Sequence, residues 1–151
     1  IMKKATDAEL MALLLPYTDF ERMTRIAIEK KHWEQATEEQ RKALIKEFST
    51  LLVHVFSASF TMAVSLSVEV KPLGPQPDPN EALVKSVLKI LRQPALSLDC
   101  RLGKKGTVWK IYDVTAGGIL VVSNYREQFS SIIARSGIDG LINTLAAKNK
   151  R

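Results

Sequence analysis

A change of hydrophobic period near residue 64 constrains the fold of this 151-residue chain more than any other feature. From about Glu38 to about Phe60 the pattern is helical, and from Phe48 onward apolar residues cover most of the circumference. Such a helix is buried on more than one side. Apolar and polar residues then alternate from Val64 to Lys71, which is typical of a half-buried strand. The chain therefore combines helices with a sheet.

Three segments in the first third of the chain carry the signature of a helix start. In each, a Thr is followed three residues later by Glu or Gln, so that the two side chains can bind each other's backbone amides. These capping boxes are Thr6–Glu9, Thr18–Glu21 and Thr37–Gln40, and each opens an apolar periodic stretch. The first third is therefore predicted to be helical.

The rest of the chain carries strand and turn signals before it becomes helical again. Four prolines between Pro72 and Asn80 exclude a helix or a central strand and predict a surface loop. Gly117 and Gly118 predict a tight bend, and Gly137 predicts the end of a helix that begins near residue 124. We expect strands at about 82–91, 95–102 and 107–115, a hairpin turn at 103–106, an apolar run at 119–122 and a last helix from residue 138.

The order of helices, antiparallel strands and helices predicts one domain over residues 1–151 with an α+β fold, in which helices pack on a curved, mainly antiparallel sheet. The net charge of +6 favours anionic partners such as phospholipid headgroups, acidic proteins or nucleic acid. Because no basic run exceeds three residues, the sequence predicts no nucleic-acid-binding arm.

The sequence offers few groups for catalysis. His32 and His54 lie on separate predicted helices without ligand spacing, so we expect no metal site. Cys100 shares a strand face with leucines, which favours a buried filler over a nucleophile. Two interpretations of Asp113 remain open. It is either the general base of a small hydrolase or isomerase, on the concave face of the sheet, or the partner of Arg101 on the neighbouring strand.

Membrane-spanning and export signals are missing from the sequence. No uninterrupted apolar segment approaches the roughly 20 residues that a membrane helix needs. The first residues lack the apolar core and cleavage site of a signal peptide. We therefore expect that any signal peptide has been removed from this chain.

Five sequence blocks occur in an order that resembles one known family. The blocks are Leu15–Thr24 (LPYTDFERMT), His32–Arg41 (HWEQATEEQR), Trp109–Val114 (WKIYDV), Ser123–Phe129 (SNYREQF) and Gly137–Leu141 (GIDGL). From about Leu15 to about Asn149 the chain resembles the toluene-tolerance or MlaC family. It departs from the family pattern at Gly117, where the family usually has Glu before the second glycine of the bend.

The resemblance implies a periplasmic carrier without enzymatic activity. Such a carrier takes phospholipid between an outer-membrane lipoprotein complex and an inner-membrane ABC transporter, which maintains outer-membrane lipid asymmetry. The acyl chains would lie in an apolar cavity between helices and sheet, with the headgroup near solvent. The resemblance thus implies phospholipid as cargo, no cofactor, no nucleic acid and a monomeric protein.

The central helix and the sheet would supply the walls of this cavity, because each buried methylene contributes roughly 0.8 kcal/mol and two acyl chains need a wide apolar surface. An Arg at the mouth suits a headgroup phosphate, and Arg126 either takes this role or is simply exposed. For each apolar residue ordinary core packing is the alternative. The predicted lipid-binding residues are Phe20, Met23, Phe48, Leu52, Val55, Phe56, Val70, Leu98, Tyr112, Val114, Tyr125 and Phe129.

Overall fold

The computed structural model describes residues 12, 15–72 and 79–150, with side chains for all of these except 56–66, 72 and 90. Helices, strands and helices follow one another as expected, which confirms the α+β class. The helical elements are η1 (Leu15–Tyr17), α2 (Phe20–Ile28), α3 (Lys30–Gln35), α4 (Glu38–Met62) and α5 (Val121–Asn149). The strands are β1 (Ala63–Pro72), β2 (Glu81–Ile90), β3 (Leu96–Lys105), β4 (Val108–Ala116) and β5 (Ile119–Leu120).

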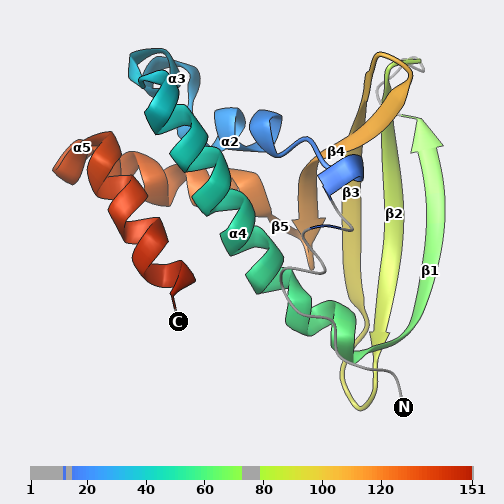
Figure 1. Ribbon diagram of the computed structural model, residues 1–151. Coiled ribbons are helices and arrows are strands. Elements are labelled where there is room, and N and C mark those ends of the chain that lie inside the picture. Colours follow the sequence, from blue (N-terminus) through green and yellow to red (C-terminus); the bar gives the residue numbers. More distant parts are fainter. Residues whose placement is uncertain (1–11, 13–14, 73–78, 151) are drawn as a thin grey trace.

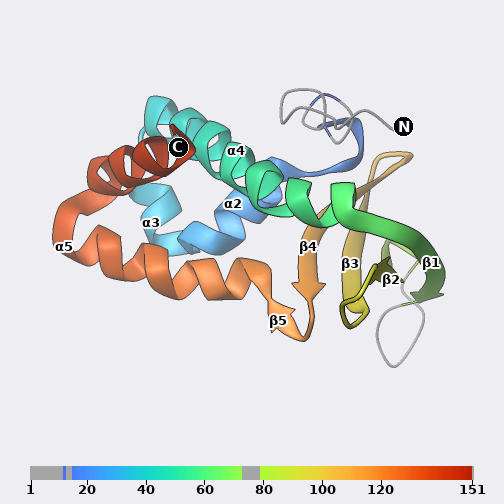
Figure 2. The same cartoon turned by 90° about the horizontal axis from the view of Figure 1, so that it is seen from below.

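The strands form one antiparallel sheet in the order β1-β2-β3-β4-β5, so that each strand pairs with its neighbours in sequence. Helices α2 and α5 gather beside the β4 end of this sheet, whereas α4 runs on to β1 at its far edge (Figures 1 and 2). The register shifts between Arg101 and Leu102, which leaves Tyr112 as the extra residue of a bulge in β4, and such bulges bend and twist a strand. The helical layer therefore meets the sheet unevenly.

Two of the three predicted capping boxes lie within the described residues, and one of them is confirmed. The Thr37 hydroxyl accepts from the Gln40 amide at 3.1 Å, while the Gln40 side chain accepts from the Thr37 amide at 2.8 Å. The prediction for Thr18 is wrong. Its backbone forms a bridge with Ile111, and the Asp19 carboxylate accepts from the Arg22 amide at 3.0 Å to cap α2. The box at Thr6–Glu9 lies outside the described residues.

The turns show where glycine is required. The hairpin predicted with a turn at 103–106 is present, but its turn is shorter. Strand β3 pairs with β4 through Lys105, so the turn falls at Gly106 and Thr107, and Gly106 has φ +66°. The bend at Gly117 and Gly118 is confirmed, with φ of +57° and +84°. Both conformations are costly for residues with a side chain. Gly137, at φ +74°, interrupts α5 where the sequence predicts a helix end.

The core lies between α4, α5 and the inner face of the sheet. An aromatic cluster forms its centre, because the ring of Phe48 meets the rings of Tyr125 and Phe129 edge to face at centroid distances of 5.4 and 5.2 Å. This is a favourable geometry for aromatic pairs. Other residues buried in this core are Leu44, Leu51, Leu52, Leu88, Leu98, Val114, Val122, Leu141 and Leu145.

Candidate functional site

The inner face of the sheet carries an apolar row that crosses four strands. Its register partners are Val70 on β1, Val84 on β2, Cys100 on β3 and Val114 on β4. Val114 is only 8% exposed beneath the helices, whereas Val70 is 67% exposed. Burial therefore decreases along one continuous row from β4 to β1.

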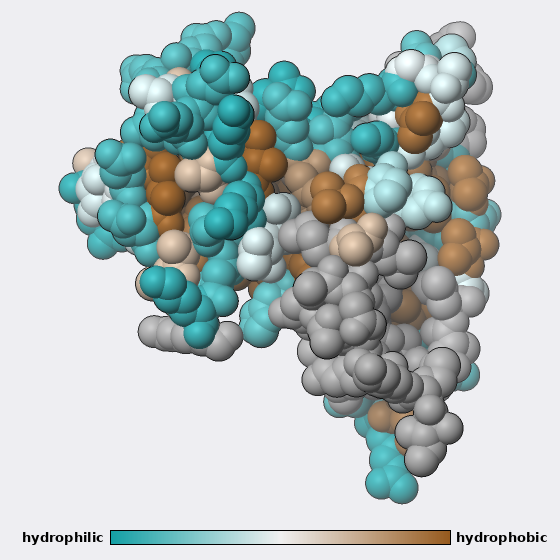
Figure 3. Space-filling model, in the orientation of Figure 1, coloured by the Kyte–Doolittle hydropathy of each residue, from teal (hydrophilic) through white to brown (hydrophobic). Residues whose placement is uncertain are grey.

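A second row runs parallel to the first and follows the same trend. It joins Val68, Ser86, Leu98 and Ala116, and Val68 is 57% exposed whereas Leu98 is buried. The polar member, Ser86, is buried but satisfied, because its hydroxyl donates to the Leu98 carbonyl. Apolar groups reach the surface along the β1 edge (Figure 3). Helices α2 and α5 pack against β4 and α4 packs against β2, whereas Val68 and Val70 on the inner face of β1 stay exposed.

Helix α4 shows the same change along its own length. Leu44, Phe48, Leu51 and Val55 follow one another at helical spacing on one face. Phe48 is 1% exposed and Leu51 is buried, but Val55 is 45% exposed. The apolar stripe of α4 thus continues beyond the core that covers its first half. Exposed apolar surface that extends a core in this way is typical of a binding site.

The predicted lipid-binding residues therefore differ in their exposure. Val55 and Val70 are exposed on the continuation of the apolar surface, whereas Tyr125 is half-buried. The side chain of Phe56 lies outside the described residues. Those that are buried in the core are Phe20, Met23, Phe48, Leu52, Leu98, Tyr112, Val114 and Phe129. Contact of any of them with lipid stays a prediction.

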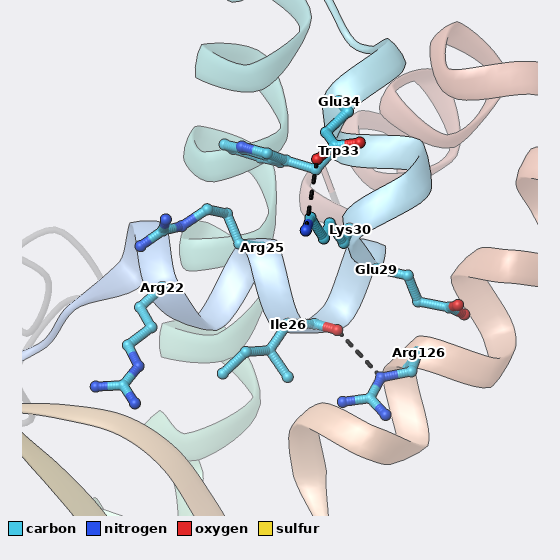
Figure 4. A pocket seen from close by; sticks show the side chains of 8 residues that line it. All are labelled: Arg22, Arg25, Ile26, Glu29, Lys30, Trp33, Glu34 and Arg126. Atoms are coloured by element: carbon cyan, nitrogen blue, oxygen red, sulfur yellow. Dashed lines mark hydrogen bonds and ion pairs between the residues drawn. The ribbon is translucent and has the colours of Figure 1, made fainter.

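Arg126 lies in a separate pocket of about 680 Å³ between α2, α3 and the first turns of α5 (Figure 4). Its Nε donates to the backbone carbonyl of Ile26 at 3.1 Å. Sequence reasoning missed the basic residues around it, Arg22, Arg25 and Lys30. The spacing of Arg22, Arg25 and Ile26 on one helix face was the signal that could have found them.

The corner between α2 and α3 is made by a residue in an uncommon conformation. Glu29 has φ +73° and ψ 148°, outside the regions that residues with a side chain favour. Its amide still donates to the Arg25 carbonyl at 3.1 Å, which ends α2. This sharp corner brings Lys30 and Trp33 of α3 to the same pocket as Arg25.

Arg22 also ties the helical layer to the sheet. Its guanidinium lies 3.6 Å from the centre of the Tyr112 ring and 3.4 Å from the Glu81 carboxylate. Gly103 makes room for it, since a Cβ there would lie 2.5 Å from Nη1 of Arg22. Burial raises the pKa of Tyr112, and the negative charge of Glu81 raises that pKa further. Four elements, α2, β2, β3 and β4, therefore meet at one polar contact.

The candidate catalytic groups do not form a reactive centre within the described part of the chain. Tyr112 and Val114 are buried under the helices, so Asp113 between them points to the other face of the sheet, and its predicted place on the concave face is wrong. Arg101 is its register partner. Burial, followed by the charge of Asp99, raises the pKa of the Cys100 thiol to about 11, so the nucleophilic thiolate is disfavoured.

Across residues 12, 15–72 and 79–150, no three His, Cys, Asp or Glu side chains come together as metal ligands. In the same ranges, no helix has both the length and the apolar character that a membrane crossing requires.

These features define a class of protein: an α+β domain whose apolar inner face continues past its own core. Residues 2–147 match the MlaC protein family, and the chain therefore belongs to this family. The resemblance noted from the sequence blocks is thereby confirmed.

A solved structure of similar fold is that of the phospholipid-binding protein from Ralstonia solanacearum, in complex with a phospholipid. The two share 28% sequence identity and superpose with a TM-score of 0.82. The match covers 96% of this chain and 83% of the other.

Proposed function

We propose that this protein is a phospholipid-binding carrier. The observation that best supports this function is the apolar surface of α4 and β1. This surface continues the core and is exposed at Val55, Val68 and Val70. Membership of the MlaC family and the phospholipid bound by the similar protein support the same function. An exposed surface of this kind loses water favourably when acyl chains cover it, at roughly 0.8 kcal/mol per methylene.

The acyl chains would lie between α4 and the inner face of the sheet. Val55 and Val70 would contact them first, because they are exposed without any movement of the helices. The buried residues Leu98, Tyr112 and Val114 would form the floor where the covered part begins. The aromatic cluster around Phe48 would support this floor from behind.

The wider role we propose is transport across the periplasm. The carrier would move phospholipid between an outer-membrane lipoprotein complex and an inner-membrane ABC transporter, as the MlaC family implies. The net charge of +6 suits brief contacts with acidic partner surfaces, since charge complementarity speeds association. Transfer needs no bond to be made or broken, so we propose no catalytic step.

The test is native mass spectrometry of the purified protein, followed by organic extraction and lipid analysis. We expect a bound mass that matches phospholipid and is released on denaturation. Val55→Asp and Val68→Asp should each fold but lose the lipid, because a carboxylate would stand where acyl chains pack. Ser67→Asp is the matched control, since alternation places it on the other face of β1.

One result would contradict the carrier function, and another would contradict the position of the lipid site. The first is a protein that is purified empty and takes up no phospholipid from added vesicles. The second is full lipid retention in Val55→Asp and Val68→Asp, which would leave lipid binding intact but place it elsewhere.

A further inference from the structure

The pocket around Arg126 carries an excess of positive charge. Four basic side chains, Arg22, Arg25, Lys30 and Arg126, line it together with two carboxylates, those of Glu29 and Glu34. The basic groups come from three elements, α2, α3 and α5 (Figure 4). Arg22 and Lys30 each have a carboxylate partner, Glu81 and Glu34, so the excess charge among the described residues comes from Arg25 and Arg126.

Several donors in this pocket have no partner within the described residues. Arg126 uses its Nε for the Ile26 carbonyl, which leaves the two terminal nitrogens of its guanidinium. No hydrogen bond or ion pair among the described residues uses the Arg25 guanidinium. Lys30 lies 3.9 Å from Glu34 in an exposed pair, and such pairs are weak in water.

Two of the cations are already held in position. Arg22 is fixed by Tyr112 and Glu81, and Arg126 is fixed by the carbonyl of Ile26. Ile26 lies between them on the same side of the pocket (Figure 4). Donors that are ordered before binding lose less entropy when a ligand arrives.

We propose that this pocket binds a phosphate group. Guanidinium forks match phosphate oxygens, and a nearby ammonium adds charge without demanding a fixed geometry. The volume of about 680 Å³ leaves room for a small polar group attached to the phosphate. The phosphate comes either from the headgroup of a lipid or from free phosphate in solution, and only the first source rests on the proposed carrier function.

The two tryptophans allow a direct test. Trp33 lines the pocket, whereas Trp109 lies on β4 outside it. Inorganic phosphate is titrated at constant ionic strength while NMR follows the two indole N–H signals. We expect a saturable shift of Trp33 and no comparable shift of Trp109. Arg25→Gln should weaken binding by about tenfold or more, because it removes a charge-assisted contact. Lys46→Gln, an exposed cation on α4 outside the pocket, should bind like wild type.

Three outcomes would overturn the anion site. They are no saturable shift at Trp33, equal shifts at Trp33 and Trp109, and unchanged affinity in Arg25→Gln. Because Arg25 is exposed, the Arg25→Gln variant should keep its fold, and circular dichroism checks that it does.

A second titration separates the two sources of phosphate. It compares the protein loaded with phosphatidylglycerol from vesicles with the same protein after lipid extraction. If the headgroup fills the pocket, only the extracted protein binds phosphate; if both forms bind equally, the site serves free phosphate. A protein that binds phosphate but never any lipid would keep the anion site and remove the carrier function.

Discussion

The covered and uncovered parts of the inner face have the same chemistry but different surroundings. Val114 and Val70 belong to one row across the sheet, and Phe48 and Val55 belong to one stripe of α4. In each pair the first residue is buried by the helical layer and the second is exposed. An apolar pattern therefore identifies a face, whereas the extent of the helical layer decides how much of that face is core.

The two parts should therefore respond differently to mutation. Residues in the covered part stabilise the folded chain through packing that is lost on unfolding. Residues in the uncovered part add little to the stability of the lipid-free protein, because water reaches them in both states. Stability measurements on protein stripped of lipid test this difference.

The largest effect is expected for Phe48→Ala. This change removes a buried ring from the contacts with Tyr125 and Phe129 and should cost about 3–5 kcal/mol. Val55→Ala, seven residues later on the same stripe, should cost less than about 0.5 kcal/mol. Urea denaturation of lipid-free protein measures both. Equal costs would show that Val55 is as much a part of the core as Phe48.

The second effect concerns Cys100, which lies in the row between Val84 and Val114. Its thiol pKa rises from 9.0 to about 11 on folding, so the folded protein holds the proton more tightly. This stabilisation is complete below pH 9 and is lost as the pH rises through about 11, by about 2–3 kcal/mol. Burial also raises the pKa values of Tyr112 and Tyr125, so the difference between wild type and Cys100→Ala isolates the thiol.

Denaturation curves at pH 8 and pH 11 test this expectation. The stability difference between wild type and Cys100→Ala should shrink at the higher pH. If it does not change, the row at Cys100 is as open to water as it is at Val70, and the border between the two parts lies closer to β4.

Much of this fold could be predicted from the sequence because periodicity reports burial directly. The change from helix to strand near residue 64 occurs where α4 ends at Met62 and β1 begins at Ala63. The cap of α2 could not be predicted as reliably, since Thr18 and Asp19 are both good caps. Next to the bridge between Thr18 and Ile111, the Asp19 amide donates to the Ile111 carbonyl at 2.7 Å. This contact between residues more than ninety positions apart decides between the two caps.

Less of the candidate site than of the fold could be predicted from the sequence. Phe48 and Val55 look alike in the sequence, because their burial depends on how far α5 extends over α4. The basic pocket depends on the corner at Glu29, whose φ of +73° no pattern of side chains indicates. Asp113 was misplaced for a simpler reason: its face of β4 was assigned without knowing which face the helices cover.

A third and smaller effect compares two valines of one row. Val114→Thr places a hydroxyl in the covered part and should cost about 1–2 kcal/mol of folding stability, because the hydroxyl loses its hydrogen bonds to water without gaining a partner in the protein. Val70→Thr makes the same chemical change in the uncovered part and should stay within about 0.5 kcal/mol. Thermal denaturation of the lipid-free variants measures the contrast. A clear loss in Val70→Thr would mean that β1 is covered in solution.

The smallest effect concerns the polar contact that fastens the covered part to the sheet. Arg22→Gln should cost about 1 kcal/mol, because the 37% exposed side chain loses a ring contact and a partly screened ion pair. Gly103→Ala should weaken the same contact by displacing the guanidinium. In the Arg22→Gln background the added methyl meets no guanidinium and only the flexible end of Glu81, at 3.1 Å, so it should cost less. A double-mutant cycle in urea should therefore give a coupling of about 1 kcal/mol. Simple additivity would show that the contact does not hold α2 to the sheet.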